Sequence, residues 1–118
     1  MGEETAVRWL QKERRMRLIT RNWRSGRGEL DIIMEDRGVL VFVEVRARSG
    51  AHPRTIFATV NKKKKRLIRQ TAKAYLRGLR ESPRTIRFDV VALTAAGRAG
   101  DEVFHYEGVP LFGRNFRA

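Results

Sequence analysis

Apolar residues repeat with helical spacing near the start of the chain and with strand spacing after it. Ala6, Val7 and Leu10 form a short apolar stripe of the kind that one helix face buries. The run Val39–Val43 is apolar on both faces of its strand, which indicates a central strand covered on both sides. The expected elements, in order, are a helix over 2–15, strands over 18–23, 29–35 and 39–48, a loop over 49–59, a helix over 62–80, and strands over 85–93 and 102–106.

The segment 62–80 has the clearest helical pattern of the chain, and Asn61 is placed to cap it. Its apolar positions fall on one face: Leu67, Ile68, Ala72, Tyr75, Leu76 and Leu79. Basic residues at steps of three and four follow another face: Lys62, Arg66, Arg69, Lys73, Arg77 and Arg80. A helix between the third and fourth strands implies a right-handed crossover and a parallel strand pair. The order is therefore αβββαβ, an α/β fold whose mixed central sheet is flanked by helices.

The length and composition fit one packed domain spanning residues 1–118. The chain has 118 residues, and 42% of them are hydrophobic, which favours a folded core over disorder. It contains no cysteine, which excludes disulfides, thiolate zinc sites and a cysteine nucleophile and is compatible with a reducing cytoplasm. No apolar run approaches the ~20 residues that a membrane helix needs, so we expect a cytoplasmic protein with no membrane partner.

The charge balance points to a polyanionic partner. There are 26 lysines and arginines against 13 acidic residues, a net charge of +13, which favours nucleic acid over a membrane surface or an acidic protein. The basic stripe of 62–80 contains no acidic residue, so phosphate contacts are a better interpretation than a merely solvated face. The residues expected to contact nucleic acid are Arg24, Arg27, Arg48, Lys62, Arg66, Arg69 and Lys73.

Asp31 and Glu44 are acidic residues inside apolar strands. Asp31 is followed by Ile32 and Ile33, and Glu44 comes directly after the run Val39–Val43. Burying such a carboxylate is costly unless it is paired or binds a metal. Because alternate residues share a strand face, neighbouring strands can bring the two carboxylates together, where oxygen ligands suit Mg²⁺ or Mn²⁺. The alternative is a set of structural ion pairs in which an arginine neutralises Glu44.

Six segments carry a family pattern: Gly2–Ala6 with Leu10, Arg21–Arg24, Gly28–Asp31, Val41–Arg46, Lys64–Leu67 with Ala72, Tyr75 and Leu76, and Arg87–Val91. In order and spacing they resemble the YraN-like uncharacterised protein family, over Gly2 to about Leu93. The step from Asp31 to Glu44-Val45-Arg46 also resembles the PD-(D/E)xK nuclease signature. The resemblance implies a restriction-endonuclease-like fold, endonuclease activity and a distant relation to archaeal Holliday junction resolvases. Structured or branched DNA is therefore the expected partner, and a homodimer is expected by analogy.

The resemblance assigns roles by position, with Asp31 and Glu44 as the metal ligands. Glu3 matches an acidic residue on the first helix of the resolvases that approaches the metals, although a helix N-terminus favours an acidic residue in any case. Arg46 stands where the wider nuclease superfamily has a lysine. Arginine stays protonated, so it can orient water or stabilise phosphorane charge but cannot take a proton from water. Arg46 thus also favours a non-catalytic nucleic-acid-binding module that keeps the nuclease fold.

Other polar residues have simpler expected roles. We expect Glu29 to pair with a nearby arginine such as Arg27, and Asp89 to partner a core arginine rather than a metal. His52 and His105 are isolated from each other in the sequence, and neither has a histidine at metal-ligand spacing. We therefore expect surface or packing roles for both.

Overall fold

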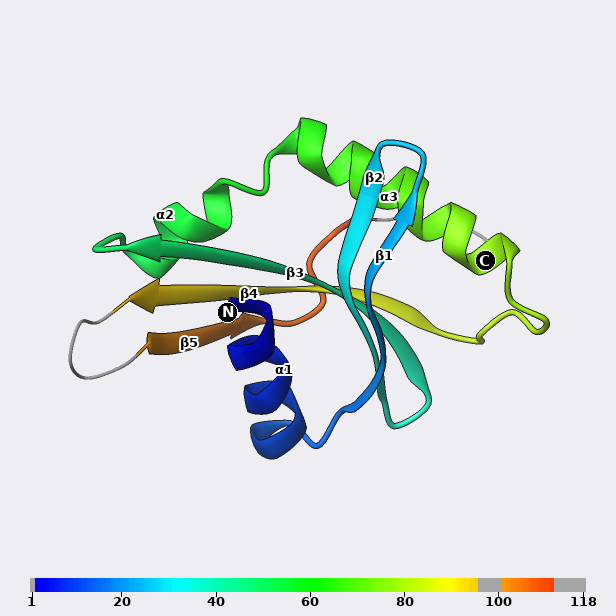
Figure 1. Ribbon diagram of the computed structural model, residues 1–118, viewed down its shortest axis with the longest axis horizontal. Helices are drawn as coiled ribbons and strands as arrows, with labels where there is room; N and C mark the ends of the chain where they lie inside the picture. The colour runs from blue at the N-terminus through cyan, green and yellow to red at the C-terminus, as the bar shows by residue number, and fades with distance from the viewer. Residues whose placement is uncertain (1, 96–100, 112–118) are drawn as a thin grey trace.

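A computed structural model describes residues 2–95 and 101–111 and shows one mixed sheet with helices on both faces (Figure 1). In chain order the elements are α1 (Gly2–Glu13), β1 (Arg17–Ser25), β2 (Gly28–Asp36), β3 (Val39–Ser49), α2 (Pro53–Ala58), α3 (Lys62–Arg77), β4 (Ile86–Ala95) and β5 (Asp101–Tyr106). The predicted α/β class and the αβββαβ order are confirmed. The predicted helix over 62–80 ends earlier, at Arg77.

The strands lie side by side in the order of the chain, β1-β2-β3-β4-β5. Only the β3–β4 pair is parallel, and the other three neighbouring pairs are antiparallel. A parallel pair needs a crossover, and here α2 and α3 supply it between β3 and β4. This mixed sheet with flanking helices is compatible with a restriction-endonuclease-like core.

The segment 49–59 is not a loop throughout, as its sequence led us to expect, because 53–58 form the short helix α2. The Nδ1 atom of His52 accepts a hydrogen bond from the Arg54 amide at 3.1 Å and so caps this helix. Pro53 occupies the first turn, where its missing N–H costs nothing, and Ile56 is buried. No helix among residues 2–95 and 101–111 is long and apolar enough to cross a bilayer.

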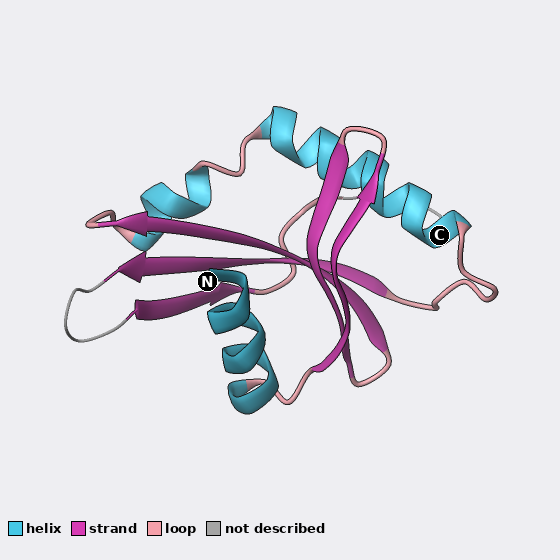
Figure 2. Ribbon diagram, viewed as in Figure 1, coloured by secondary structure: helices cyan, strands magenta, loops and turns pink. Residues whose placement is uncertain are grey.

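Each face of the sheet has its own apolar core, one under α3 and one under α1 (Figure 2). On the α3 face, the buried ring of Phe42 lies with Phe88 and Ile68. On the α1 face, Leu10 packs with residues such as Val43. Because successive residues of β3 alternate between these two cores, both of its faces are covered, as the apolar run predicted.

The β1–β2 hairpin passes close against α3, and Gly28 marks the contact (Figure 1). A Cβ atom at Gly28 would overlap the Thr71 hydroxyl, which is itself held by donating a hydrogen bond to the Leu67 carbonyl oxygen at 2.7 Å. Only glycine therefore allows β2 to begin this close to the helix.

The hairpin also leaves the rest of the sheet partway along β2. The β2–β3 ladder runs from Asp36 opposite Val39 to Ile32 opposite Val43. The β1–β2 ladder continues beyond that point, as far as Ser25 opposite Gly28. Of the first four residues of β2, Gly28, Glu29 and Leu30 pair with β1 and none pairs with β3, so a gap opens between β2 and β3.

Candidate active site

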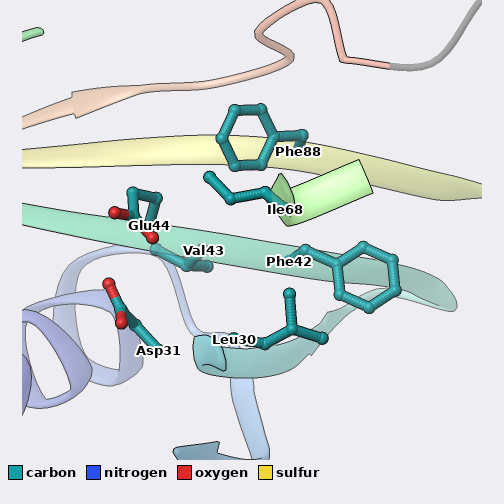
Figure 3. A pocket seen from close by; sticks show the side chains of 7 residues that line it. All are labelled: Leu30, Asp31, Phe42, Val43, Glu44, Ile68 and Phe88. Atoms are coloured by element: carbon teal, nitrogen blue, oxygen red, sulfur yellow. The ribbon is translucent and has the colours of Figure 1, made fainter. Parts of the chain in front are cut away.

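Asp31 and Glu44 meet at the point where β2 leaves β3. The β2–β3 ladder ends at the pair Ile32–Val43. Asp31 directly precedes Ile32 in β2, and Glu44 directly follows Val43 in β3. Their carboxyl groups point toward one another (Figure 3). Asp31 Oδ2 also accepts a hydrogen bond from the Val45 backbone amide at 2.9 Å. The structure therefore brings together the two residues that the sequence singled out as metal ligands.

The environment of Glu44 strongly disfavours its charged form. The residue is 4% exposed, and the small cleft around it is lined by apolar side chains that include Phe42, Ile68 and Phe88 (Figure 3). Burial, followed by the charge of Asp31 and a hydrogen bond to that side chain, raises the pKa of Glu44 to about 8. The metal-free site therefore disfavours a second negative charge beside Asp31.

Two basic side chains approach the same oxygen of Glu44 and oppose this shift. The Nε atom of Arg46 lies 3.3 Å from Glu44 Oε2, and the Nζ atom of Lys64 lies 3.6 Å from it. The sequence predicted Arg46 at this site and missed Lys64. Arg46 Nε is buried and has no hydrogen-bond acceptor among the described residues, because its contact with Glu44 has the distance of an ion pair without the geometry of a hydrogen bond.

Glu3 reaches the same gap from the other face of the sheet. Burial raises the pKa of Glu3, and the charges of Asp31 and Glu29 raise it further, while a hydrogen bond to the Asn22 side chain lowers it. Asn22 lies in β1 with φ at 52°, in the left-handed region that asparagine tolerates better than most residues. The predicted residue Glu3 thus interacts electrostatically with Asp31, and Asn22 is a neighbour of Glu3 that the sequence analysis did not identify.

Asp31 and Glu44 offer carboxylate oxygens, the donor type that holds a divalent ion such as Mg²⁺. Among residues 2–95 and 101–111, no group of three or more histidine, cysteine or acidic side chains is placed to hold a metal. Mg²⁺ is commonly held by one or two carboxylates, with water and substrate phosphate completing its shell. Asp31 and Glu44 supply two such carboxylates, and a dication between them would oppose the burial and the repulsion from Asp31 that raise the pKa of Glu44.

The predicted phosphate-binding residues of α3 lie on its outer side. Lys62 and Arg66 are exposed and, with Lys65 and Arg69, line a groove of about 230 Å³ against Pro110 and Leu111. Within this groove, Arg69 Nη1 donates a hydrogen bond to the Leu111 carbonyl oxygen at 3.1 Å. Arg69 therefore holds the segment after β5 in place. Lys73 is exposed one turn further along the helix.

The arginines predicted outside α3 have different surroundings. The Nε atom of Arg24 donates to Glu29 Oε2 at 2.7 Å, so the expected arginine partner of Glu29 is Arg24 rather than Arg27. Arg27 is exposed at the hairpin turn and lines a second groove with Arg77 of α3. Arg48 is exposed near the end of β3 and donates to the Ala47 carbonyl oxygen at 2.7 Å.

Asp89 belongs to a buried network away from this gap. It accepts hydrogen bonds from Arg87 Nε at 2.9 Å and the Gly108 amide at 3.0 Å, and it lies 2.7 Å from His105 Nε2. Burial alone would raise the pKa of Asp89, but these hydrogen bonds together outweigh burial and lower it. The expected pairing of Asp89 with a core arginine is confirmed, and so is a packing role for His105, which also accepts from Arg14 Nε at 3.3 Å.

Several relatives match most of this chain. The model of uncharacterised protein family UPF0102 matches residues 2–93. A UPF0102 protein of Psychromonas ingrahamii is 44% identical over 93 residues, covering 79% of this chain and 75% of the relative. A UPF0102 protein of Mycobacterium sp. is 37% identical over 111 residues, covering 92% and 82%. A UPF0102 protein of Coxiella burnetii is 43% identical over 98 residues, covering 80% and 78%.

Proposed function

The chain belongs to uncharacterised protein family UPF0102, the YraN family whose pattern its sequence carries, and we propose that it is a nucleic-acid-binding endonuclease. The proposed reaction is hydrolysis of a phosphodiester bond in structured or branched DNA, with Mg²⁺ or Mn²⁺ as cofactor. The observation that carries the proposal is the approach of two carboxyl groups, Asp31 and Glu44, in a gap between two strands. Two acids placed together in this way are costly to bury, and a divalent ion between them would offset that cost.

Each side chain of the gap has a role in this proposal. Asp31 and Glu44 would hold the metal, which would supply a polarised water and offset charge on the phosphate. Val45 fixes Asp31 through its amide, so that the carboxylate is oriented before substrate arrives. Arg46 contributes a permanent positive charge next to Glu44. Glu3 adds a further acidic side chain that interacts electrostatically with Asp31.

The remaining charge of the molecule suits a nucleic-acid backbone. The net charge is +13, although the gap itself gathers acidic side chains. A surface meant only to bind phosphate would not place carboxylates at its centre. We therefore assign the exposed residues Lys62, Arg66 and Lys73 to backbone contacts that position the substrate, with Arg24, Arg27 and Arg48 as further contacts beyond the helix.

The experiment that tests the proposal is a cleavage assay. Purified protein is incubated with linear duplex, single-stranded, flapped and four-way DNA, each with Mg²⁺, Mn²⁺ or a chelator. We expect cleavage of at least one branched form that needs the metal and stops with the chelator. Binding without cleavage of any form, with either metal, would contradict the proposal.

A second candidate function is a nucleic-acid-binding module without turnover. The observation that favours it is the Arg46–Glu44 ion pair, because an arginine stands where a titratable side chain would be useful and already partly neutralises Glu44. In that case the wild-type protein binds branched DNA equally well with metal and with chelator, and it does not cleave.

A further inference from the structure

Lys64 enters the gap from α3, on the side opposite to Glu3. Its backbone amide donates to Asn61 Oδ1 at 2.9 Å, so Lys64 lies in the capped first turn of the helix. Its Nζ atom lies 3.6 Å from Glu44 Oε2, and the side chain is one third exposed. The neighbouring Lys63 is exposed and does not form an ion pair with Glu44. One lysine of the basic run is thus set apart from the others by its contact with a buried acid.

In the metal-free gap, both positive charges lie against the same buried acid. Arg46 Nε and Lys64 Nζ are each within ion-pair distance of Glu44 Oε2. A dication between the carboxylates would neutralise them by itself and leave both basic side chains with surplus charge. A phosphodiester carries one negative charge, and its pentacovalent transition state carries more, so the surplus has the sign and size that this reaction needs.

We infer that Lys64 changes its partner. In the metal-free protein its ammonium lies against Glu44, and in the metal-loaded protein it contacts a non-bridging oxygen of the scissile phosphate together with Arg46. This inference rests on the proposed function, and it adds a phosphate-contacting residue to the site. Arg46 supports it independently, because its buried Nε–H lacks a hydrogen-bond acceptor among the described residues and an oxygen of the substrate would provide one.

The two side chains suit such a clamp for different reasons. Lysine has a flexible four-carbon stem and three rotatable donors, so Lys64 can leave Glu44 without moving α3. Arg46 presents a rigid fork from β3, so it fixes the direction of approach. Neither residue needs to release a proton in this role.

The reaction is balanced without a proton on either residue. The oxygen of a water molecule forms a bond to phosphorus, and the bond from phosphorus to the sugar oxygen breaks. The attacking water loses its proton to solvent, and the departing sugar oxygen takes one from solvent. Lys64 and Arg46 remain charged throughout and offset the negative charge that builds up on the non-bridging oxygens.

The test compares the salt dependence of DNA binding with and without metal. Wild type, Lys64→Met and the matched control Lys63→Met are titrated with a short four-way DNA in Ca²⁺ and in chelator, at several salt concentrations. In Ca²⁺ we expect Lys64→Met to neutralise one phosphate fewer than wild type, which reduces the slope of log K against log salt by about 0.9. In chelator its slope should match that of wild type, because Lys64 is then held by Glu44.

The control and a second variant separate this role from a general one. Lys63→Met should change the slope equally in Ca²⁺ and in chelator, or leave it unchanged in both. Lys64→Arg keeps the charge and should restore the wild-type slope in Ca²⁺. Removing the ammonium that competes for Glu44 Oε2 should also raise the Ca²⁺ affinity of Lys64→Met severalfold in the absence of DNA. A thermal melt of each variant confirms that it is folded.

The inference and the proposed function fail in different ways. If wild type cleaves DNA with Mg²⁺ but Lys64→Met has the same slope deficit in Ca²⁺ and in chelator, Lys64 does not change partner and the inference is wrong. A Lys64→Met slope equal to wild type in both conditions overturns it as well. If Ca²⁺ does not affect the wild type at all, Lys64 never leaves Glu44. If the metal-dependent slope appears without any cleavage, the inference holds and the nuclease activity fails.

Discussion

The backbone amide of Val45 donates a hydrogen bond to Asp31 Oδ2 at 2.9 Å, just beyond the last paired residues of β2 and β3. A side-chain oxygen thus takes the place that a backbone carbonyl of β2 occupies where the two strands still pair. The amide is satisfied, which buried backbone requires, and the carboxyl group of Asp31 is fixed in the direction of Glu44. The same hydrogen bond therefore satisfies the backbone where the sheet opens and orients the acid.

Replacing either acid of the gap should abolish cleavage and keep DNA binding. We expect Asp31→Asn and Glu44→Gln each to reduce the cleavage rate at least 100-fold, because each removes a metal ligand while keeping the shape of the side chain. Glu35→Gln is the matched control, since Glu35 lies on β2 with Asp31 but pairs with Arg17 near the surface. Rates and DNA affinities of all four proteins are measured in Mg²⁺. Cleavage that survives both substitutions would exclude this gap as the active site.

The stability of the metal-free protein should fall as pH rises through the neutral range. The pKa of Glu44 is raised from 4.5 to about 8, so between these values the folded protein keeps a proton that the unfolded chain has lost. The free energy of unfolding therefore decreases with pH, by at most about 1.4 kcal/mol per pH unit for one group, and levels off above about pH 8. Urea unfolding at pH 5, 6, 7 and 8 measures this slope. Glu44→Gln should flatten it, and an identical slope in the two proteins would show that Glu44 ionises normally.

The sequence predicted the site better than it predicted the connections around it. Glu44 stands out because it follows five apolar residues of a central strand, and α3 stands out because its apolar and basic faces are continuous. The short helix α2 was missed because His52 and Pro53, which start it, are also typical of loops. Lys64 was missed because it lies in a run of five basic residues, and only the path of α3 past β3 separates it from its neighbours.

The hydrogen bond from Val45 to Asp31 could not be predicted for a different reason. It depends on where the β2–β3 ladder ends, and that end is set by the packing of the hairpin against α3 rather than by the local sequence. Asn22 is similar, because its contact with Glu3 needs α1 and β1 to be placed first. The local sequence pattern thus predicted the strands and the acids, whereas the geometry between them depends on tertiary packing.

Charge reversal on the outer side of α3 should weaken DNA binding without unfolding the protein. In Lys62→Glu/Arg66→Glu we expect the slope of log K against log salt to decrease by about 0.9 for each phosphate that the variant no longer neutralises. Both side chains are exposed, so the melting temperature should hardly change. Arg69→Glu is the contrasting variant, because Arg69 binds the Leu111 carbonyl oxygen and its replacement should lower the melting temperature. Unchanged DNA affinity in the double variant would remove this side of α3 from the interface.

Arg46→Lys should keep or increase cleavage. A lysine at this position retains the positive charge beside Glu44 and adds a side chain that can exchange protons with water. Arg46→Ala, in contrast, should lose activity because the charge disappears. Initial rates with four-way DNA compare the three proteins. If wild type and Arg46→Lys both fail on every DNA form while still binding, the non-catalytic module becomes the better interpretation.

Asp89→Asn should destabilise the protein and leave the metal site intact. Asp89 is fully buried and accepts hydrogen bonds from Arg87 and Gly108, so its removal leaves the Arg87 guanidinium without its main partner. Breaking such a buried pair costs about 3 kcal/mol. Urea unfolding at pH 7 measures the loss, and Mn²⁺ titration should give the wild-type affinity. Since the pKa of Asp89 is lowered, the difference between the two proteins should shrink as pH falls below about 4. A normal stability with altered Mn²⁺ affinity would place Asp89 in the metal site instead.

The close approach of Gly28 to Thr71 has a mechanical consequence for chemistry that takes place elsewhere. Gly28 is three residues from Asp31 on one strand, and Thr71 is seven residues from Lys64 on one helix. The contact therefore sets the distance between β2, which carries Asp31, and α3, which carries Lys64. A side chain at position 28 would push the strand and the helix apart and would separate Asp31 from Lys64, although neither residue is changed. The spacing of the acid and the lysine thus depends on the absence of a methyl group at Gly28, outside the proposed site.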